Sequence, residues 1–237
     1  MNDNKNKICL ITGASSGIGY ALAKGLKEDG YRLVLNARRE ERLKELQCDT
    51  VDIIPGDLTD NEFVDSLDGY VFYKFGKCDI LINNAGIIEA APIEELDIKR
   101  MSKMIRLNVE ATFRLTYRFM KLFKKQGYGH LINMSSVLGT KVRPTAGAYA
   151  ATKFAMEALS EALRLELIGS DIKISCIEPG LVMTELHDSW EVHPKDKFGI
   201  RDPLVPEDIV ETVRFILKQP EYVRIPKLMI LPKDHNI

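Results

Sequence analysis

A tyrosine stands four residues before a lysine in the stretch GAYAATKFAMEAL, which runs from Gly147 to Leu159. Alanine, methionine and leucine favour a helix there. Side chains four residues apart lie on the same face of a helix, so Tyr149 and Lys153 are neighbours. A phenol with an ordinary pKa of about 10 needs a nearby cation before it can exchange protons at neutral pH. A packed tyrosine beside a solvated lysine would look the same, and the rest of the chain must decide between these interpretations.

A glycine-rich turn, TGASSGIG, follows the first apolar run and contains Gly13, Gly17 and Gly19. Glycines allow a tight turn and a close approach to a pyrophosphate, whose charge is favoured by the N-terminus of the following helix. The spacing G-x-x-x-G-x-G differs from the G-x-G-x-x-G fingerprint of dinucleotide-binding folds. The position of the turn, after a strand and before a helix, is what makes phosphate binding a reasonable prediction.

Two arginines, Arg38 and Arg39, follow the second apolar run in LVLNARREERL. An NAD-binding fold usually has an acidic residue here for the ribose hydroxyl, whereas an arginine accommodates a 2′-phosphate. A guanidinium can hold a phosphate through paired hydrogen bonds. Arg39 could instead begin a solvated helix with the next two glutamates, but for Arg38 the phosphate is the favoured partner. The sequence therefore predicts NADP rather than NAD.

The elements that must position these residues alternate along the chain. Most of the short apolar runs lack a clean polar alternation, as expected for strands buried on both faces. Repeated strand–helix alternation predicts one doubly wound α/β domain over residues 1–237, with a seven-stranded parallel sheet and helices on both faces. The predicted strands are KICLIT, YRLVLNA, VDIIPGD, DILINNAG, HLINMSS, IKISCIEPG and KLMILP. The predicted helices run from Ile18 to Asp29, Glu40 to Leu46, Asn61 to Phe75, Ile98 to Lys125, Tyr149 to Ile168 and Pro206 to Lys218.

One segment, residues 185–203, has mixed charge, two prolines and no clear period. Long irregular insertions in compact α/β domains are usually functional lids or flexible loops. This segment follows the sixth predicted strand, and ligands of such sheets bind outside the carboxyl ends of the strands. We therefore expect a substrate loop. Trp190 could be a lid contact or simple packing, and His187 and His193 could contact substrate, although surface positions are favoured for them.

Composition excludes several classes of protein. The chain has 237 residues, of which 45% are hydrophobic and 28% charged, with a net charge of −1. The small net charge gives no electrostatic reason to expect nucleic acid or an anionic membrane as partner. No segment has the roughly 18 consecutive apolar residues of a membrane span. The cysteines and histidines show no metal-binding spacing, and scattered single cysteines favour a reducing cytoplasm. These cysteines are Cys9, Cys48, Cys78 and Cys176.

Five motifs occur in a fixed order along the chain. They are TGASSGIG, NNAG from Asn83 to Gly86, SSVLG from Ser135 to Gly139, YAATK from Tyr149 to Lys153, and PGLVMT from Pro179 to Thr184. Together they resemble the short-chain dehydrogenase/reductase family in its single-domain form. The resemblance covers the chain from Lys7 to about Pro232.

This resemblance implies roles for particular residues. Tyr149 is the expected general acid and base, and Lys153 and the oxidised nicotinamide would lower its pKa by roughly three units. Ser136, thirteen residues before the tyrosine, is the expected partner of the substrate oxygen, rather than Ser135. Asn108 resembles the residue that holds a water between Lys153 and solvent. Alternatively, Ser136 could merely end its strand and Asn108 could interrupt its helix locally.

The same resemblance implies a set of cofactor-binding residues beside Tyr149 and Lys153. They are Gly13, Ser15, Ser16, Gly17, Ile18, Gly19, Arg38, Arg39, Asp57, Leu58, Asn84, Ala85, Gly86, Pro179, Gly180, Val182 and Thr184.

The expected activity is NADP(H)-dependent interconversion of a carbonyl and a secondary alcohol on a small-molecule substrate. The C-terminal part also resembles branches that act on small hydroxy acids or serve as broad ketone reductases. An NADP-binding sensor without turnover is the alternative, and epimerisation or dehydration is disfavoured. The family resemblance implies a homodimer or homotetramer, formed through the helices predicted around residues 98–125 and 149–168.

Overall fold

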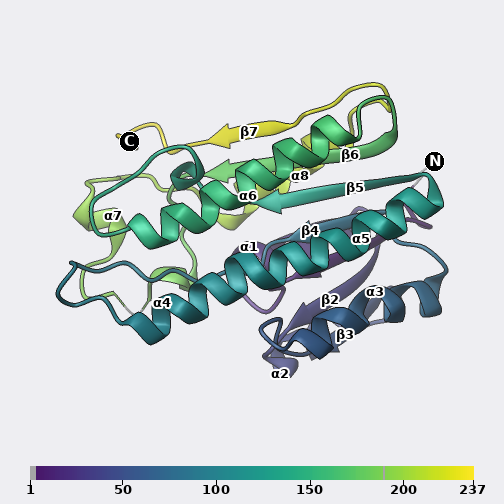
Figure 1. The fold of residues 1–237 in the computed structure, drawn as a ribbon, viewed down its shortest axis with the longest axis horizontal. Coiled ribbons are helices and arrows are strands. Elements are labelled where there is room, and N and C mark those ends of the chain that lie inside the picture. Colours follow the sequence, from purple (N-terminus) through teal and green to yellow (C-terminus); the bar gives the residue numbers. More distant parts are fainter. Residues whose placement is uncertain (1–3, 189) are drawn as a thin grey trace.

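The computed structural model describes residues 4–188 and 190–237, and it contains the predicted parallel sheet (Figure 1). Seven strands pair in the order β3-β2-β1-β4-β5-β6-β7, and every neighbouring pair is parallel. Each predicted apolar run forms one strand, so the predicted fold class is confirmed. The strands are β1 (Ile8–Thr12), β2 (Arg32–Ala37), β3 (Val51–Pro55), β4 (Ile80–Asn83), β5 (Tyr128–Met134), β6 (Asp171–Pro179) and β7 (Lys227–Ile230).

Most of the predicted helices form close to their expected bounds. Asp60 begins α3 by accepting hydrogen bonds from the backbone N–H groups of Glu62 and Phe63, and Gly76 ends it in the left-handed conformation. The helices are α1 (Gly17–Glu28), α2 (Glu40–Lys44), α3 (Asn61–Phe75), α4 (Ile98–Ile105), α5 (Thr112–Gln126), α6 (Gly147–Glu166), α7 (Pro194–Lys197) and α8 (Pro206–Leu217).

The helix predicted from Ile98 to Lys125 is not one uniform α-helix. Helices α4 and α5 are joined by a π-helical segment, Arg106–Ala111. Within it the Asn108 side chain binds the backbone of Ile87, accepting from its N–H at 3.0 Å and donating to its carbonyl oxygen at 2.9 Å. A single π-helical turn inside a longer helix is uncommon and is often found at functional sites. Here it fixes the segment after β4 against the middle of the helix.

Helices cover both faces of the sheet, and each face has its own apolar core. On one face, Leu22 of α1 and Ile209 of α8 pack against alternate strand residues such as Ile11. On the other face, Phe119 of α5 and Leu163 of α6 pack against the intervening residues such as Leu10, together with α3. This alternation follows from the period of two along a strand. In Figure 1, α5 and α6 lie side by side across the front of the sheet.

The carboxyl ends of the central strands meet at one edge of the sheet. Thr12 at the end of β1 pairs with Asn36 of β2, and Asn83 at the end of β4 pairs with Asn133 of β5. The chain runs outward from β1 through β2 to β3, and from β4 in the other direction to β7. Such a reversal leaves a crevice between the first and fourth strands, where open α/β sheets bind ligands.

The segment predicted to be an irregular substrate loop contains two short helical turns, apart from Ser189, which lies outside the described residues. A 3₁₀ turn spans Glu185–His187, and α7 follows four residues after Trp190. His193 begins α7 by accepting a hydrogen bond at Nδ1 from the backbone N–H of Lys195, 3.1 Å away. Pro194 occupies the first turn, where its missing N–H costs nothing. The hydrophobic period did not predict α7, but the capping residues His193 and Pro194 indicate where it begins.

Candidate active site

A cleft of about 720 Å³ opens at the carboxyl edge of the sheet. It extends from the glycine-rich turn and the end of β2 to the start of α6 and the segment after β6. The structure brings most of the predicted site residues to its wall, and Gly19 and Asn108 are not part of the lining. The predicted residues on the wall are Gly13, Ser15, Ser16, Gly17, Ile18, Arg38, Arg39, Asp57, Leu58, Asn84, Ala85, Gly86, Ser136, Tyr149, Lys153, Pro179, Gly180, Val182 and Thr184.

The glycine-rich turn needs its glycines for two different reasons. Gly13 has a φ of 68°, in the left-handed region that favours glycine. A Cβ on Gly19 would lie 2.3 Å from the carbonyl oxygen of Gly13, so a side chain there would push the turn apart. The Thr12 hydroxyl then ties this turn to the NNAG motif, because it accepts hydrogen bonds from the N–H groups of Asn84 and Ala85 at 3.0 Å each. The glycine-rich turn and the NNAG motif are therefore held together on one side of the cleft.

The two arginines after β2 have different surroundings. Arg39 donates from Nε to the Ser15 hydroxyl at 3.1 Å and pairs with Glu185 at 2.8 Å. It therefore joins the glycine-rich turn to the segment after β6 and does not simply begin a solvated helix. Within the described ranges no carboxylate forms an ion pair with Arg38. Burial raises the pKa of Asp57, but bonds from Thr59 and the nearby charge of Arg38 outweigh it and hold that pKa below its usual value.

Tyr149 and Lys153 are both buried at the other end of the cleft, with 7% and 5% of their surface exposed. Burial raises the pKa of Tyr149 to about 12, and a hydrogen bond with the Ser136 side chain opposes that rise. Burial lowers the pKa of Lys153 to about 8. In the protein without cofactor, burial is the larger influence on this pKa. The predicted fall requires Lys153 and the oxidised nicotinamide together, and it stays a prediction. With its pKa raised in this way, Tyr149 is protonated at neutral pH and can donate that proton.

The two neighbouring serines separate clearly in the structure. Ser136 has a partly exposed side chain on the cleft wall, and its hydroxyl accepts a hydrogen bond from the N–H of Leu138 at 3.1 Å. Ser135 is buried, and its hydroxyl has no hydrogen-bond partner among the described residues. Because Ser136 is the serine that bonds Tyr149, the geometry favours it as the partner of a substrate oxygen.

Asn108 lies close to Lys153 but is already engaged. The point where a Cβ of Gly86 would stand is 3.3 Å from Oδ1 of Asn108 and 3.8 Å from Nζ of Lys153. The Asn108 amide nitrogen donates to the carbonyl oxygen of Ile87 and, at 3.3 Å, to the Thr152 hydroxyl. Both of its protons are thus used. The side chain clamps the segment after β4, and its predicted role in holding a water stays a prediction.

The cleft also contains Arg143 and His235, which the sequence did not single out, and two residues of the predicted substrate loop. Arg143 donates to Nε2 of His235 at 2.7 Å, which brings the C-terminal segment to the cleft wall. His187 packs edge-on against Trp190 at 5.2 Å between ring centres, and both line the cleft. Burial lowers the pKa of His187 to about 4, so it is neutral. Only the position of Arg143, between two motifs of the site, could have drawn attention to it.

The fold and this arrangement define a class of protein. The family model described as short chain dehydrogenase matches residues 7–195, and the chain belongs to this family. It is an oxidoreductase family whose members use NAD or NADP. Within the part of the chain that the structure describes, no helix is long and apolar enough to cross a membrane.

Particular relatives share nearly the whole chain. An uncharacterized oxidoreductase of Staphylococcus aureus strain USA300 is 34% identical over 231 residues, covering 96% of this chain and 97% of the relative. A serine dehydrogenase in its closed form, complexed with NADP⁺, is 27% identical with a TM-score of 0.90, covering 97% of this chain and 96% of that one. An alcohol dehydrogenase of the archaeon Thermococcus sibiricus, complexed with 5-hydroxy-NADP, is 32% identical with a TM-score of 0.86 and covers 98% of both chains.

Proposed function

We propose that this protein is an NADP(H)-dependent oxidoreductase that interconverts a carbonyl and a secondary alcohol, with residues 1–237 acting as one cofactor-binding domain. The observation that carries the proposal is the buried Tyr149, which hydrogen-bonds Ser136 and has Lys153 beside it. These residues share one cleft with the glycine-rich turn. Structural relatives named serine dehydrogenase and alcohol dehydrogenase support the same type of substrate group.

The nicotinamide cofactor, when bound, supplies or accepts the hydride. The chain itself has to orient the substrate and move one proton. Ser136 would donate a hydrogen bond to the substrate oxygen, where negative charge develops. Tyr149 would give its proton to that oxygen in the reduction direction. Lys153, one helical turn away, would stabilise the phenolate that remains.

Preference for NADP rests on the end of β2. Arg38 lines the cleft there and has no carboxylate partner among the described residues. Arg39 lies next to it and already contacts Ser15 of the glycine-rich turn. This end of the cleft therefore presents the guanidinium of Arg38 where a 2′-phosphate would sit, with Arg39 next to it already paired with Glu185. Asp57 lines the same end of the cleft, and its charge is offset by that of Arg38. The two structural relatives with NADP or 5-hydroxy-NADP bound agree with this choice.

The test follows NADPH absorbance with keto acids, aldehydes, diketones and cyclic ketones, with NADH in parallel. NADPH oxidation by one group of compounds, lost in Tyr149→Phe, is the expected result. Tight NADPH binding with no turnover of any carbonyl would replace the proposal with the sensor alternative. No described residue favours that alternative, since Tyr149, Lys153 and Ser136 are all in place.

The proposal also includes the oligomeric state of the protein and its location in the cell. We expect a homodimer or homotetramer through α5 and α6, which carry exposed apolar side chains such as Tyr117, Phe154 and Leu165. A sedimentation experiment that found only monomer at micromolar concentration would contradict this. A cytoplasmic location is expected from the four free cysteines.

A further inference from the structure

Arg143 is a cation of the cleft that contacts no anion. Its Nη2 donates to Nε2 of His235 at 2.7 Å and to the carbonyl oxygen of Asn236 at 3.3 Å. Its guanidinium carbon lies 4.1 Å from the centre of the Phe198 ring. Within residues 4–188 and 190–237, no carboxylate forms an ion pair with Arg143. All its partners are therefore neutral.

Two other arginines on the cleft wall are paired with carboxylates. Arg39 lies 2.8 Å from Glu185, and Arg100 lies 2.9 Å from Glu89. Arg143 differs from these two in having no carboxylate partner among the described residues, and from Arg38 in standing six residues before Tyr149 in the chain. The cofactor phosphates belong to the opposite end, with the glycine-rich turn. The charge of Arg143 thus has no function in the mechanism given above, which uses only the charge of Lys153 at the tyrosine end.

The loop that carries Arg143 is held in a costly conformation. Thr145 has a φ of 68°, a left-handed conformation that threonine rarely adopts. Its carbonyl oxygen accepts a hydrogen bond from the N–H of Ala91 at 3.1 Å, which ties the loop to the segment after β4. Backbone strain of this kind persists where the surrounding structure enforces it, commonly at ligand sites. It fixes Arg143 in place.

The immediate surroundings of Arg143 are suited to an anion. A guanidinium can only donate, so Nε2 of His235 accepts this bond and the neutral ring carries its proton on Nδ1. In that tautomer Nδ1 does not accept from the N–H of Leu181, which lies 3.3 Å away. Burial lowers the pKa of Arg143, which shows that part of its hydration has been removed. A carboxylate would replace the neutral nitrogen with a charged acceptor, and charge-assisted hydrogen bonds are roughly twice as strong as neutral ones. The Phe198 ring stacks on the face of the guanidinium, so hydrogen bonds to Arg143 are made at its edge, as Nη2 does with His235.

We propose that the substrate carries a carboxylate, which pairs with Arg143 while its carbonyl or hydroxyl group lies at Tyr149 and Ser136. The substrates are then oxo acids in the reduction direction and the corresponding hydroxy acids in oxidation. This inference rests on the proposed function, because it assigns a substrate class to the same cleft. His235 and Phe198 hold the guanidinium plane, and the planar fork can meet both oxygens of one carboxylate.

The test compares each acid with its own methyl ester. The panel contains 2-oxobutanoate, 3-oxobutanoate and 4-oxopentanoate, assayed with NADPH. The full-length enzyme should have a higher kcat/KM on one of the acids than on its ester. In Arg143→Met the acid-to-ester ratio of kcat/KM should fall about 30-fold, the cost of one charge-assisted bond. Arg143→Lys should restore part of the ratio, because it keeps the charge without the fork.

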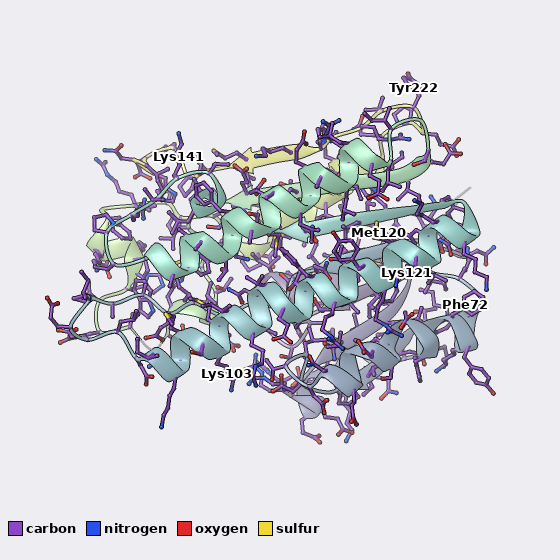
Figure 2. The ribbon with its side chains drawn as sticks, viewed as in Figure 1. Phe72, Lys103, Met120, Lys121, Lys141 and Tyr222 are labelled. Carbon is purple, nitrogen blue, oxygen red and sulfur yellow. The ribbon has the colours of Figure 1, made fainter. Side chains whose placement is uncertain are left out.

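The control removes an equivalent charge from the same loop. Lys141 is exposed, lies at the outer edge of the molecule in Figure 2, and does not line the cleft. Lys141→Met should leave the acid-to-ester ratio unchanged. If the ratio fell equally in both variants, long-range attraction rather than a specific pair would explain it. That result would overturn the inference.

A binding measurement keeps the inference separate from turnover. Butyrate and butyramide, which have no ketone, are titrated by calorimetry into the protein with NADP⁺ present. We expect butyrate to bind better than butyramide, and Arg143→Met to abolish the difference. Equal binding of the two compounds would overturn the carboxylate site even if ketones are reduced. Absence of turnover together with Arg143-dependent butyrate binding would overturn the proposed function and leave the carboxylate site supported.

Discussion

The ammonium nitrogen of Lys153 lies 5.7 Å from the centre of the Tyr149 ring and donates a hydrogen bond to the carbonyl oxygen of Met134 at 2.9 Å. The side chain of Lys153 is therefore held at the end of β5 and does not extend into solvent. Its charge acts on the tyrosine from a fixed place. Since burial raises the pKa of Tyr149, this fixed cation is most useful after the tyrosine has given up its proton.

Removal of the Tyr149 hydroxyl should abolish the chemistry and preserve cofactor binding. Tyr149→Phe keeps the ring in its packed site among Met104, Val137 and Ala150. General acid catalysis typically contributes about 10²–10⁴-fold, so kcat for carbonyl reduction should fall by that factor. NADPH affinity, measured by fluorescence titration, should change little. Tyr128→Phe is a matched control, because that tyrosine is exposed at the start of β5. Near-normal turnover in Tyr149→Phe would refute the assignment.

The rate of carbonyl reduction should fall as the pH rises through about 8. Burial lowers the pKa of Lys153 to about 8, so the cation that stabilises the developing phenolate is lost above that pH. Tyr149 keeps its proton over the same range because its pKa lies near 12. The kcat profile of the wild type between pH 6 and 10 should thus show one falling limb. Lys153→Met should be slow throughout and lack this limb. An identical limb in that variant would mean that a different group titrates.

The strands and the motif positions could be predicted from the sequence because they depend on local information. Strands that are buried on both faces of a sheet have continuous apolar sequences, which can be recognised directly. The glycine-rich turn from Gly13 to Gly19 is likewise evident from its residue types and spacing. The predicted bounds of α3 agree with the structure because Asp60 and Gly76 are strong local capping residues. These features need no knowledge of distant contacts.

The remaining features depend on contacts between distant parts of the chain. Arg143 meets His235, which is 92 residues away, and Arg39 meets Glu185, which is 146 residues away. No spacing rule connects such residues. The π-helical turn at Asn108 similarly depends on the backbone of Ile87. The depth at which Tyr149 is buried, which raises its pKa in the protein without cofactor, also could not be read from the sequence.

Reversal of charge at Arg38 should move cofactor preference toward NADH. Arg38→Asp removes the proposed phosphate partner and adds the carboxylate that would suit a free ribose hydroxyl. The ratio of kcat/KM for NADPH to that for NADH should fall about 10- to 100-fold, the value of one charge-assisted contact. Lys44→Asp makes the same change of charge on α2 outside the cleft and controls for long-range effects. An unchanged ratio in Arg38→Asp would remove Arg38 from the phosphate site.

Lys227 should stabilise the fold by compensating two buried carboxylates behind the active site. Its Nζ lies 3.0 Å from Glu157 and 3.1 Å from Glu178, whose side chains are 9% and 0% exposed. Lys227→Met should lower the free energy of unfolding by about 2 kcal/mol at pH 7.5. This is less than the cost of breaking a fully buried ion pair, because about half of the lysine side chain is exposed to solvent.

The pH dependence of this loss identifies its cause. Burial raises the pKa of Glu178 above its ordinary value, so the folded state binds more protons than the unfolded state between those two values. Stability contributed by that proton is present at low pH and is lost as the pH rises through the raised pKa. Without Lys227 the two carboxylates repel each other only when ionised, so the deficit of Lys227→Met should be smaller at pH 5 than at pH 7.5. Urea unfolding at both pH values, with exposed Lys121→Met on α5 (Figure 2) as control, measures this. Equal deficits at the two pH values would show that Lys227 contributes packing and not charge.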